Sequence, residues 1–432
     1  MNERVSAFLS KHNFVQHIDI DSFSKALLSD MRNGIAGNKS DEDMIRTWTT
    51  PPQKAIASKK VIVIDAGGTN FRSCLVSFDE NGVPSISNLE KTSMPGIERE
   101  LSFTEFFDQF AKNLEHLKGL SDSIGFCFSY PTEIQKDGDG ILLGFSKEVK
   151  APEVVGKPIG KSLSDALVAH GWERPKRISL LNDTVAALLA GAASRSKNVQ
   201  YSSYIGFILG TGMNAAYIQP ATDVSKDFEK AQIVVCESGK FCSVVQSDFD
   251  KAVDAKTSKP GTFLMEKGCS GAYLGPLSYE ALKLAAEEGC FSPKVAEKIK
   301  KLEKLTLIES DGFLHTPYDN TTTLGAIFAD GGTQEDYGFA FDLLDAIVER
   351  SARYAATILS ACVIQSGKGK DPTKPVCILC NGSTYHKTYK VADRVKGYLE
   401  EILTRQKGLY WKIVAVENDI TLGAAIGGLI ER

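Results

Sequence analysis

The chain has 432 residues, of which 43% are hydrophobic and 24% are charged, as is ordinary for a soluble globular protein. At about 150 residues per domain, this length predicts two or three domains, enough to form a cleft between lobes. With 50 Lys and Arg residues against 54 Asp and Glu residues, the formal net charge is -4. This balance argues against a nucleic-acid binder that neutralises the phosphate backbone, although a local phosphate site needs only a few donors.

No run of about 18 apolar residues is present, so the sequence predicts no transmembrane helix and no membrane partner. The chain's start lacks the apolar core of a signal peptide. The nine cysteines lie mostly inside apolar runs, which favours buried free thiols and a cytoplasmic location. Cys377 and Cys380 form a CxxC pair on a strand-like run without partner ligands, so a structural interpretation is favoured over a metal or redox site.

The predicted elements alternate between strands and helices, which is typical of an α/β fold. In chain order we expect two amphipathic helices within 1–57, strands at 61–65, 71–78 and 83–89, a helix at 104–117, a strand at 123–129, a helix within 152–169, a strand at 177–181, a helix at 185–193, strands at 203–209 and 214–218, a mostly helical stretch at 277–370, a strand at 376–379, a helix at 391–403, a strand at 409–416 and a helix at 421–430. A strand, a Gly-Thr turn and a second strand occur twice, about 140 residues apart. This weak duplication predicts two lobes that enclose a ligand.

Two glycine-rich turns each follow an apolar strand: Asp65-Ala66-Gly67-Gly68-Thr69-Asn70 and Gly210-Thr211-Gly212. Glycines let the backbone approach a ligand closely, and successive N–H groups in such a turn can cradle a phosphate. Neither turn is a Walker loop or a dinucleotide fingerprint. Each alone could be a plain hairpin turn, but the pair favours a phosphate chain bound between two lobes. Asp65, at the end of its strand, could hold Mg²⁺ through water.

Polar side chains that suit phosphoryl transfer or a polyhydroxylated ligand lie elsewhere. The stretch Leu181-Asn182-Asp183-Thr184 places an Asp at a strand-to-helix junction, where Asp and Asn are ordinary N-caps. Such an Asp can also accept the proton of a hydroxyl that attacks a phosphate. Glu237 and Glu266, with Asn214, could bind sugar hydroxyls, because carboxylates accept hydrogen bonds and amides both donate and accept. Solvated glutamates, or the two carboxylates of a glycosidase, are the alternatives, but a glycosidase leaves both Gly-Thr turns unexplained.

In their order along the chain these motifs resemble those of the hexokinase family, in the actin-like ATPase superfamily. The matching segments are 61–72, 125–131, 144–151, 181–185, 206–217, 260–275, 350–357 and 381–383. The resemblance implies an α/β fold with two RNase-H-like lobes around a central cleft. The smaller lobe is expected to comprise residues 60–182 and 418–432, and the larger lobe residues 1–59 and 183–417.

The resemblance implies ATP-dependent phosphorylation of the 6-hydroxyl of glucose or a related aldohexose, the first step of glycolysis, with ATP and Mg²⁺ as cofactors. Asp183 would be the general base, and Lys147 would neutralise charge on the transferred phosphoryl group. The sugar would be held by Ser129, Ser146, Asn182, Asn214, Glu237 and Glu266. The nucleotide would be held by Asp65, Gly67, Gly68, Thr69, Asn70, Gly210, Thr211, Gly212, Gly382 and Ser383, with Asp65 orienting Mg²⁺ through water.

The chain departs from the family pattern at three motif positions, one of which, Ser146 in place of a Thr, keeps the hydroxyl. Glu237-Ser238-Gly239 stands where the family has Glu-Trp-Gly, which leaves the preferred hexose open, and Asn381 stands where the adenosine motif has an Asp. Two other functions are alternatives to the kinase. An actin-like or chaperone-like ATPase needs the phosphate turns but no sugar residues, and a non-catalytic sugar sensor would be expected to have lost Asp183 or a turn. The oligomeric state stays open.

Overall fold

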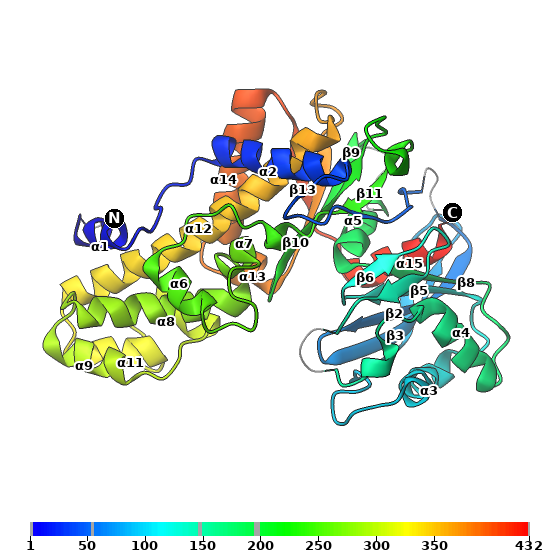
Figure 1. Ribbon diagram of the computed structural model, residues 1–432, viewed down its shortest axis with the longest axis horizontal. Coiled ribbons are helices and arrows are strands. Elements are labelled where there is room, and N and C mark those ends of the chain that lie inside the picture. The colour runs from blue at the N-terminus through cyan, green and yellow to red at the C-terminus, as the bar shows by residue number, and fades with distance from the viewer. Residues whose placement is uncertain (1–2, 53–55, 146–148, 194–198, 431–432) are drawn as a thin grey trace.

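The computed structural model describes residues 3–52, 56–145, 149–193 and 199–430, which form two α/β lobes (Figure 1). The smaller lobe, at the lower right of Figure 1, is built on a five-stranded sheet. In spatial order its strands are β4 (Pro84–Ser93), β3 (Asn70–Phe78), β2 (Lys59–Gly67), β5 (Ser123–Phe128) and β8 (Arg177–Leu181). The central strands are nearly continuous apolar runs, as expected for strands that are covered on both faces.

The larger lobe is built on a six-stranded sheet. In spatial order its strands are β1 (Ile45–Arg46), β11 (Gln232–Val235), β10 (Met213–Gln219), β9 (Ser203–Leu209), β12 (Val376–Asn381) and β13 (Trp411–Val414). Its helices are α1 (Glu3–Lys11), α2 (Ile20–Ile35), α6 (Asp248–Asp254), α7 (Leu264–Lys267), α8 (Gly271–Glu287), α9 (Pro293–Lys301), α10 (Leu307–His315), α11 (Thr323–Ala329), α12 (Gln334–Ser366), α13 (Ser383–Lys387) and α14 (Val391–Leu399), which continues into a π-helix, η5 (Glu400–Gln406).

The two sheets repeat one arrangement of strands. In each sheet three antiparallel strands, β4-β3-β2 or β11-β10-β9, are followed by two strands that pair in parallel, β5-β8 or β12-β13. This confirms the internal duplication predicted from the strand and turn pattern. The Gly-Thr turns connect β2 to β3 and β9 to β10, so the duplication places them at corresponding corners of the two lobes.

Two helices cross between the lobes. Helix α5 (Asp183–Ala193) follows β8 of the smaller sheet but packs on β9 and β12 of the larger one. Helix α15 (Asp419–Leu429) follows β13 of the larger sheet but packs on β2 and β5 of the smaller one. The two helices also contact each other, as Figure 1 shows at the junction of the lobes. The remaining helices of the smaller lobe are α3 (Phe103–Asn113) and α4 (Ile159–Ala169).

Glycines make this crossing possible because the backbones meet almost directly. A Cβ atom on Gly423 of α15 would lie 1.8 Å from the carbonyl oxygen of Ala186 of α5. A Cβ atom on Gly206 of β9 would lie 2.1 Å from the carbonyl oxygen of Thr184, and one on Gly125 of β5 would lie 1.9 Å from a carbonyl oxygen of α15. Each sheet therefore holds its crossing helix at a glycine in one of its central strands.

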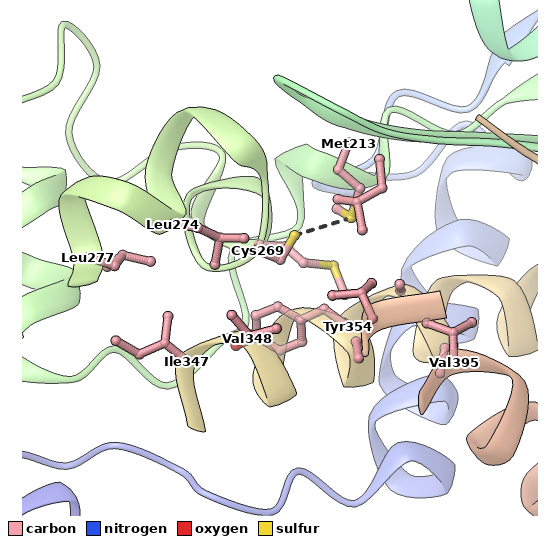
Figure 2. Close-up of a cluster of buried hydrophobic side chains, with 14 of the residues drawn as sticks. Met213, Cys269, Leu274, Leu277, Ile347, Val348, Tyr354 and Val395 are labelled. Carbon is pink, nitrogen blue, oxygen red and sulfur yellow. Dashed lines mark hydrogen bonds between the residues drawn. The ribbon is translucent and has the colours of Figure 1, made fainter. Parts of the chain in front are cut away.

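A buried core supports the larger lobe where α12 passes beneath β10 and the turn between α7 and α8 (Figure 2). Figure 2 shows the Sγ atom of Cys269 directed at the Sδ atom of Met213, 3.4 Å away. A Cβ atom on Gly268 would lie 2.8 Å from the ring of Tyr354 in α12. Glu266 lies two residues before Gly268, so its backbone packs closely against this core.

Most of the predicted elements are confirmed, and the strands expected at 177–181 and 203–209 have those bounds. The prediction missed the hairpin of β6 (Thr132–Ile134) and β7 (Gly140–Leu142), and the strand expected at 409–416 is shorter. All nine cysteines are free. In the described ranges no helix is long and apolar enough to cross a membrane, and no three His, Cys, Asp or Glu side chains cluster as metal ligands.

The substitution Gly206→Ala should lower the free energy of unfolding by about 2 kcal/mol, because the added methyl group must displace the backbone of α5. The matched control is Gly397→Ala in α14, where a Cβ atom meets nothing within 4 Å and helix propensity favours alanine. Urea unfolding of both variants measures the difference. Equal stability of the two would contradict the close packing of α5 on β9.

Candidate active site

Residues 182 and 183 lie where the chain leaves the smaller sheet and starts α5. The Oδ1 atom of Asn182 accepts hydrogen bonds from the backbone N–H of Thr184 at 2.9 Å and from its hydroxyl at 2.5 Å. The interpretation of this stretch as a helix cap is therefore right for Asn182. Its side-chain amide nitrogen is the group that could still bind a ligand. Asp183 is the first residue of α5, where the helix dipole favours a negative charge.

Asp183 is only partly exposed and has other carboxylates nearby. Burial raises its pKa to about 6, against the lowering effect of the Thr184 N–H, and the charge of Asp65 raises it further. The side chain of Asp65, near the end of β2, is 23% exposed, and its Oδ2 atom lies 3.8 Å from Arg72 Nη1. Burial raises the pKa of Asp65, Arg72 lowers it and Asp419 raises it. Three carboxylates from different elements therefore approach one another near the start of α5.

Asp419 is a member of this group that the sequence analysis did not identify. It is the first residue of α15, and both its oxygens accept hydrogen bonds from Nδ2 of Asn381, at 2.8 and 2.6 Å. A repeated dipeptide in the sequence could have identified it, because Asn418-Asp419 and Asn182-Asp183 each lie where a Gly- and Ala-rich helix starts. Asn381, which replaces the Asp of the family motif, thus bonds to the start of α15.

A second polar group lies beside β10. The Nδ2 atom of Asn214 donates to Oε1 of Glu237 at 2.7 Å, and the Glu237 N–H donates back to Oδ1 of Asn214 at 3.0 Å. Oε2 of Glu266 accepts the N–H of Met213 at 3.0 Å. A Cβ atom on Gly239 would lie 3.1 Å from Cβ of Glu266, so only a small residue fits between the two glutamates. We call Glu237 and Glu266 the glutamate pair.

Glu237 has an unusual backbone and an unusual charge environment. Its φ of 58° lies in the left-handed region, which is costly for a residue other than glycine and is most often seen at functional sites. Burial raises the pKa of Glu237 to about 7, while the ammonium group of Lys240 lowers it and the carboxylates of Asp43 and Asp183 raise it. Asp183, at the start of α5, is therefore one of the charges that act on Glu237.

The first turn (67–70) closes the β2–β3 hairpin, with Gly67 opposite Asn70 and Gly68 at a φ of 58°. The carbonyl oxygen of Gly68 accepts the hydroxyl of Tyr130 at 2.8 Å. A Cβ atom on Gly67 would lie 2.9 Å from Cβ of Ser129. The first turn therefore packs directly on the segment that carries Ser129.

The second turn (210–212) closes the β9–β10 hairpin, and the N–H of Gly210 donates to the carbonyl oxygen of Gly212 at 2.9 Å. The carbonyl oxygen of Gly210 accepts the N–H of Gly271 at 2.8 Å and the hydroxyl of Thr384 at 2.9 Å. The N–H of Ala272, the next residue of α8, donates to the carbonyl oxygen of the turn's central threonine. The turn is thus fixed by α8 and by the segment after β12.

The second turn touches both the residues expected at the nucleotide and those expected at the sugar. A Cβ atom on Gly382, whose φ is 111°, would lie 2.2 Å from the carbonyl oxygen of Leu209. Ser383, the next residue, is exposed. On the other side, a Cβ atom on Gly212 would lie 2.7 Å from Oε2 of Glu266. The expected nucleotide and sugar residues therefore form one continuous surface here.

Most residues predicted for the site thus lie on neighbouring elements, and Ser146 and Lys147 lie outside the described residues. A separate cavity of about 730 Å³ lies between the lobes, lined by the β6–β7 hairpin, by residues between 34 and 48 and by residues 225–228. Within the described ranges, the predicted site residues do not line it. Across it, Nζ of Lys136 lies 4.8 Å from the ring centroid of Trp48.

Comparisons with known proteins agree with this geometry. Two family models described as hexokinase match residues 7–193 and 204–430. The chain is 27% identical to Hexokinase-1 of Schizosaccharomyces pombe over 430 residues, covering 94% of this chain and 86% of that protein. It is also 27% identical to Hexokinase-9 of Oryza sativa subsp. japonica, over 93% of this chain and 84% of that protein.

A solved structure has the same fold: the hexokinase from Schistosoma mansoni complexed with glucose, with a TM-score of 0.79, 22% identity and coverage of 99% of this chain and 98% of that one. The two duplicated lobes, with a Gly-Thr turn in each, have the actin-like ATPase fold. The chain belongs to the hexokinase family.

The buried carboxylate of Asp183 should reduce stability at neutral pH. Its pKa of about 6 in the folded chain lies above the ordinary value of 3.8, so folding favours the protonated carboxyl group. The stability that comes from this protonated form is fully present below pH 4 and is lost as the pH rises through 6. Asp183→Asn should therefore increase the free energy of unfolding at pH 7.5 by about 1–2 kcal/mol, and the gain should shrink towards pH 4.

Urea unfolding of Asp183→Asn at several pH values measures this gain. Asp319→Asn is the control, because hydrogen bonds from Thr321 lower the pKa of Asp319 and its removal should not stabilise the chain. A gain for Asp183→Asn that does not depend on pH would contradict the burial of its charge.

Proposed function

We propose that this hexokinase-family chain transfers the terminal phosphoryl group of ATP to the 6-hydroxyl of glucose or a closely related aldohexose. The observation that carries the proposal is the position of Asp183, where the chain leaves β8 of the smaller sheet and starts α5, which packs on β9 and β12 of the larger sheet. The first glycine turn follows β2 of the smaller sheet and the second follows β9 of the larger one, so Asp183 starts a helix that joins the two sheets carrying the turns. A carboxylate base at such a junction suits phosphoryl transfer, which depends on positioning and charge stabilisation.

Asp183 would accept the proton of the attacking hydroxyl. With a pKa of about 6 it is mostly ionised at pH 7.5, and it is still a better proton acceptor than an ordinary aspartate. Its position at the start of α5 means that its carboxylate is held by the helix and not by a loop. The glutamate pair, Asn214, Asn182 and Ser129 would bind the other hydroxyls and orient the ring.

The backbone N–H groups of the two turns would bind the phosphates, with Thr69, Asn70 and Thr211 beside them and Gly382 and Ser383 bordering the adenosine. The carboxylates near Asp65 suit Mg²⁺, which prefers oxygen ligands and keeps several waters. In the described ranges there is no cage of three or more ligating side chains, which fits an ion held chiefly by water and phosphate. Mg²⁺, when bound, would neutralise charge on the phosphates.

Closure of the lobes would exclude water so that the sugar is phosphorylated instead. We place the lobe boundaries at the start of α5 and before α15, so that residues 60–182 and 418–432 move against the rest. Lys147 remains predicted to touch the 6-hydroxyl and to neutralise charge on the transferred phosphoryl group, and Ser146 remains predicted to hold another sugar hydroxyl. We also infer a cytoplasmic enzyme at the first step of glycolysis, since the substrate implied is free hexose.

The first test is ADP release from Mg-ATP with and without glucose, mannose, fructose, glucosamine and N-acetylglucosamine. We expect release that depends on glucose or a close aldohexose. Asp183→Ala should lower kcat by roughly 100-fold or more, because the attacking hydroxyl loses its base. Release that ignores every sugar would contradict the proposal, and near-normal turnover of Asp183→Ala would remove Asp183 from the base role.

The glutamate pair can be tested through Gly239. In Gly239→Ala the new methyl group would press on Cβ of Glu266 and on the carbonyl oxygen of Met213, both 3.1 Å away. We expect the KM for the hexose to rise about tenfold, equal to the loss of roughly one hydrogen bond, with the KM for ATP unchanged. Gly338→Ala in α12, where a Cβ atom meets nothing within 4 Å, is the control. A change in the KM for ATP alone would contradict this assignment.

A further inference from the structure

Asn381 and Asp419 form a hydrogen-bonded bridge between the larger sheet and a helix that lies on the smaller one. Asn381 is the last residue of β12 in the larger sheet. Asp419 is the first residue of α15, which packs on β2 and β5 of the smaller sheet (Figure 1). The Nδ2 atom of Asn381 donates to both carboxylate oxygens of Asp419, at 2.8 and 2.6 Å. We call this contact the 381–419 bridge.

The residue types at the two ends of the bridge suit each other. An ionised carboxylate can only accept hydrogen bonds, so the partner of Asp419 must supply the N–H groups. An Asp at position 381, as in the family motif, would lack a donor and would place two carboxylates at this distance. The departure of this chain from the motif thus matches the presence of Asp419. Because the acceptor is charged, the hydrogen bonds are stronger than those between neutral groups.

The Asp419 end of the bridge is fixed at the start of α15. Its Oδ1 atom also accepts the N–H of Ile420 at 2.8 Å, and its negative charge lies at the positive end of the helix dipole. The preceding residue, Asn418, has a left-handed backbone with a φ of 53°. Such a conformation persists only where surrounding contacts hold it. The bridge is a contact of this kind, made by the next residue of the chain.

The Asn381 end leads directly into the residues expected to border the adenosine. Gly382 follows with a φ of 111°, and a Cβ atom on it would lie 2.2 Å from the carbonyl oxygen of Leu209. The hydroxyl of Thr384 donates to a carbonyl oxygen of the second turn at 2.9 Å. Between these two tightly held residues, Ser383 is exposed. A displacement of Asn381 would therefore displace Ser383 and press on the second turn.

We propose that Asn381 and Asp419 are positioning residues for the nucleotide, whose bridge holds Gly382 and Ser383 in place to border the adenosine of ATP. The bridge also ties this border to the smaller lobe, which carries the first turn. The proposal rests on the proposed function, because it takes Gly382 and Ser383 as nucleotide residues. A segment that is already held in its binding conformation loses less freedom when the ligand binds. Breaking the bridge therefore weakens nucleotide binding although neither bridge residue need touch the nucleotide.

Two other roles for these residues predict different results. If the bridge only stabilises the fold, its loss should lower the temperature of unfolding and leave nucleotide affinity unchanged. If the charge of Asp419 acts directly on the phosphates, the position of the charge should matter and the bridge should not. Exchanging the two residues separates these cases. The exchanged variant, Asn381→Asp with Asp419→Asn, again places an amide donor opposite a carboxylate but moves the charge to position 381.

The experiment measures the Kd of Mg-ADP by calorimetry and the KM values for ATP and glucose. Asn381→Ala should bind Mg-ADP about tenfold more weakly, as expected for the loss of roughly one hydrogen bond to a charged group. Asn381→Asp should weaken binding at least as much, because two carboxylates then face each other. The exchanged variant should recover an affinity within about twofold of the wild type. The KM for ATP should follow the Kd of Mg-ADP, and the KM for glucose should stay unchanged.

The control is Asn33→Ala, which removes an exposed carboxamide of α2 and should change none of these values. Thermal unfolding checks that each variant is folded, and Asp419→Asn, which preserves the shape of the side chain, takes the place of any single variant that is not. Mg-ADP affinity that is unchanged in the single variants would overturn the proposal. So would an exchanged variant that binds as weakly as Asn381→Asp, or a KM for glucose that rises together with the KM for ATP.

Failure of the proposed function gives a different result. Mg-ADP binding by a wild type that phosphorylates no hexose would overturn the proposed function alone, because the Mg-ADP affinities would still decide the role of the bridge. A wild type that does not bind Mg-ADP would overturn both.

Discussion

The contact of α5 with α15 is the constraint on which the rest of this structure depends. The two helices approach so closely that a Cβ atom on Gly423 would lie 1.8 Å from the carbonyl oxygen of Ala186. Each helix follows one sheet along the chain and packs on the other. The lobes are therefore joined by an exchange of helices, and the first residues of both helices are brought to the same place between the sheets.

The chemistry follows from this exchange. Because α5 begins with Asp183 and α15 with Asp419, the crossing brings two carboxylates towards Asp65 at the end of β2. The duplication of the sheets places a glycine turn at the corresponding corner of each lobe. The two turns come from equivalent positions of one repeated fold, and so do the carboxylates that start α5 and α15.

The group proposed to bind the sugar is held by more local contacts. The glutamate pair sits on two turns with left-handed backbones, and glycines at 212 and 239 leave just enough room for the side chain of Glu266. Beneath it lies the core that α12 forms with Met213 and Cys269 (Figure 2). Burial raises the pKa of Glu237 to about 7, so the charge of this member of the pair is costly.

Sequence patterns predicted the parts of this fold that are local. Apolar runs ending in Gly-Thr turns revealed the strands and their duplication, because both signals lie within ten residues or so. The β6–β7 hairpin was missed because its strands have only three residues each, too few to show a period. The exchange of α5 and α15 could not be predicted, since a helix pattern does not state which sheet the helix covers.

The site divides in the same way. The turns, Asp183 and the glutamate pair stand in motifs with a chemical reason for each residue type. Asp419 stands in none, and its contacts are with residues far away in the sequence. Asn182 is the opposite case, a motif residue with a local structural role. The resemblance assigned it to the sugar, but its carboxamide oxygen accepts hydrogen bonds from Thr184 and caps α5.

The central claim is that these groups direct one phosphoryl group to one hydroxyl of a hexose. The most direct measurement is NMR of uniformly ¹³C-labelled glucose after incubation with the chain and Mg-ATP, with phosphorus located by its coupling to carbon. The account predicts coupling at C6, from a 6-phosphate ester. Phosphorus coupled to C1, or inorganic phosphate released with the glucose unchanged, would contradict it.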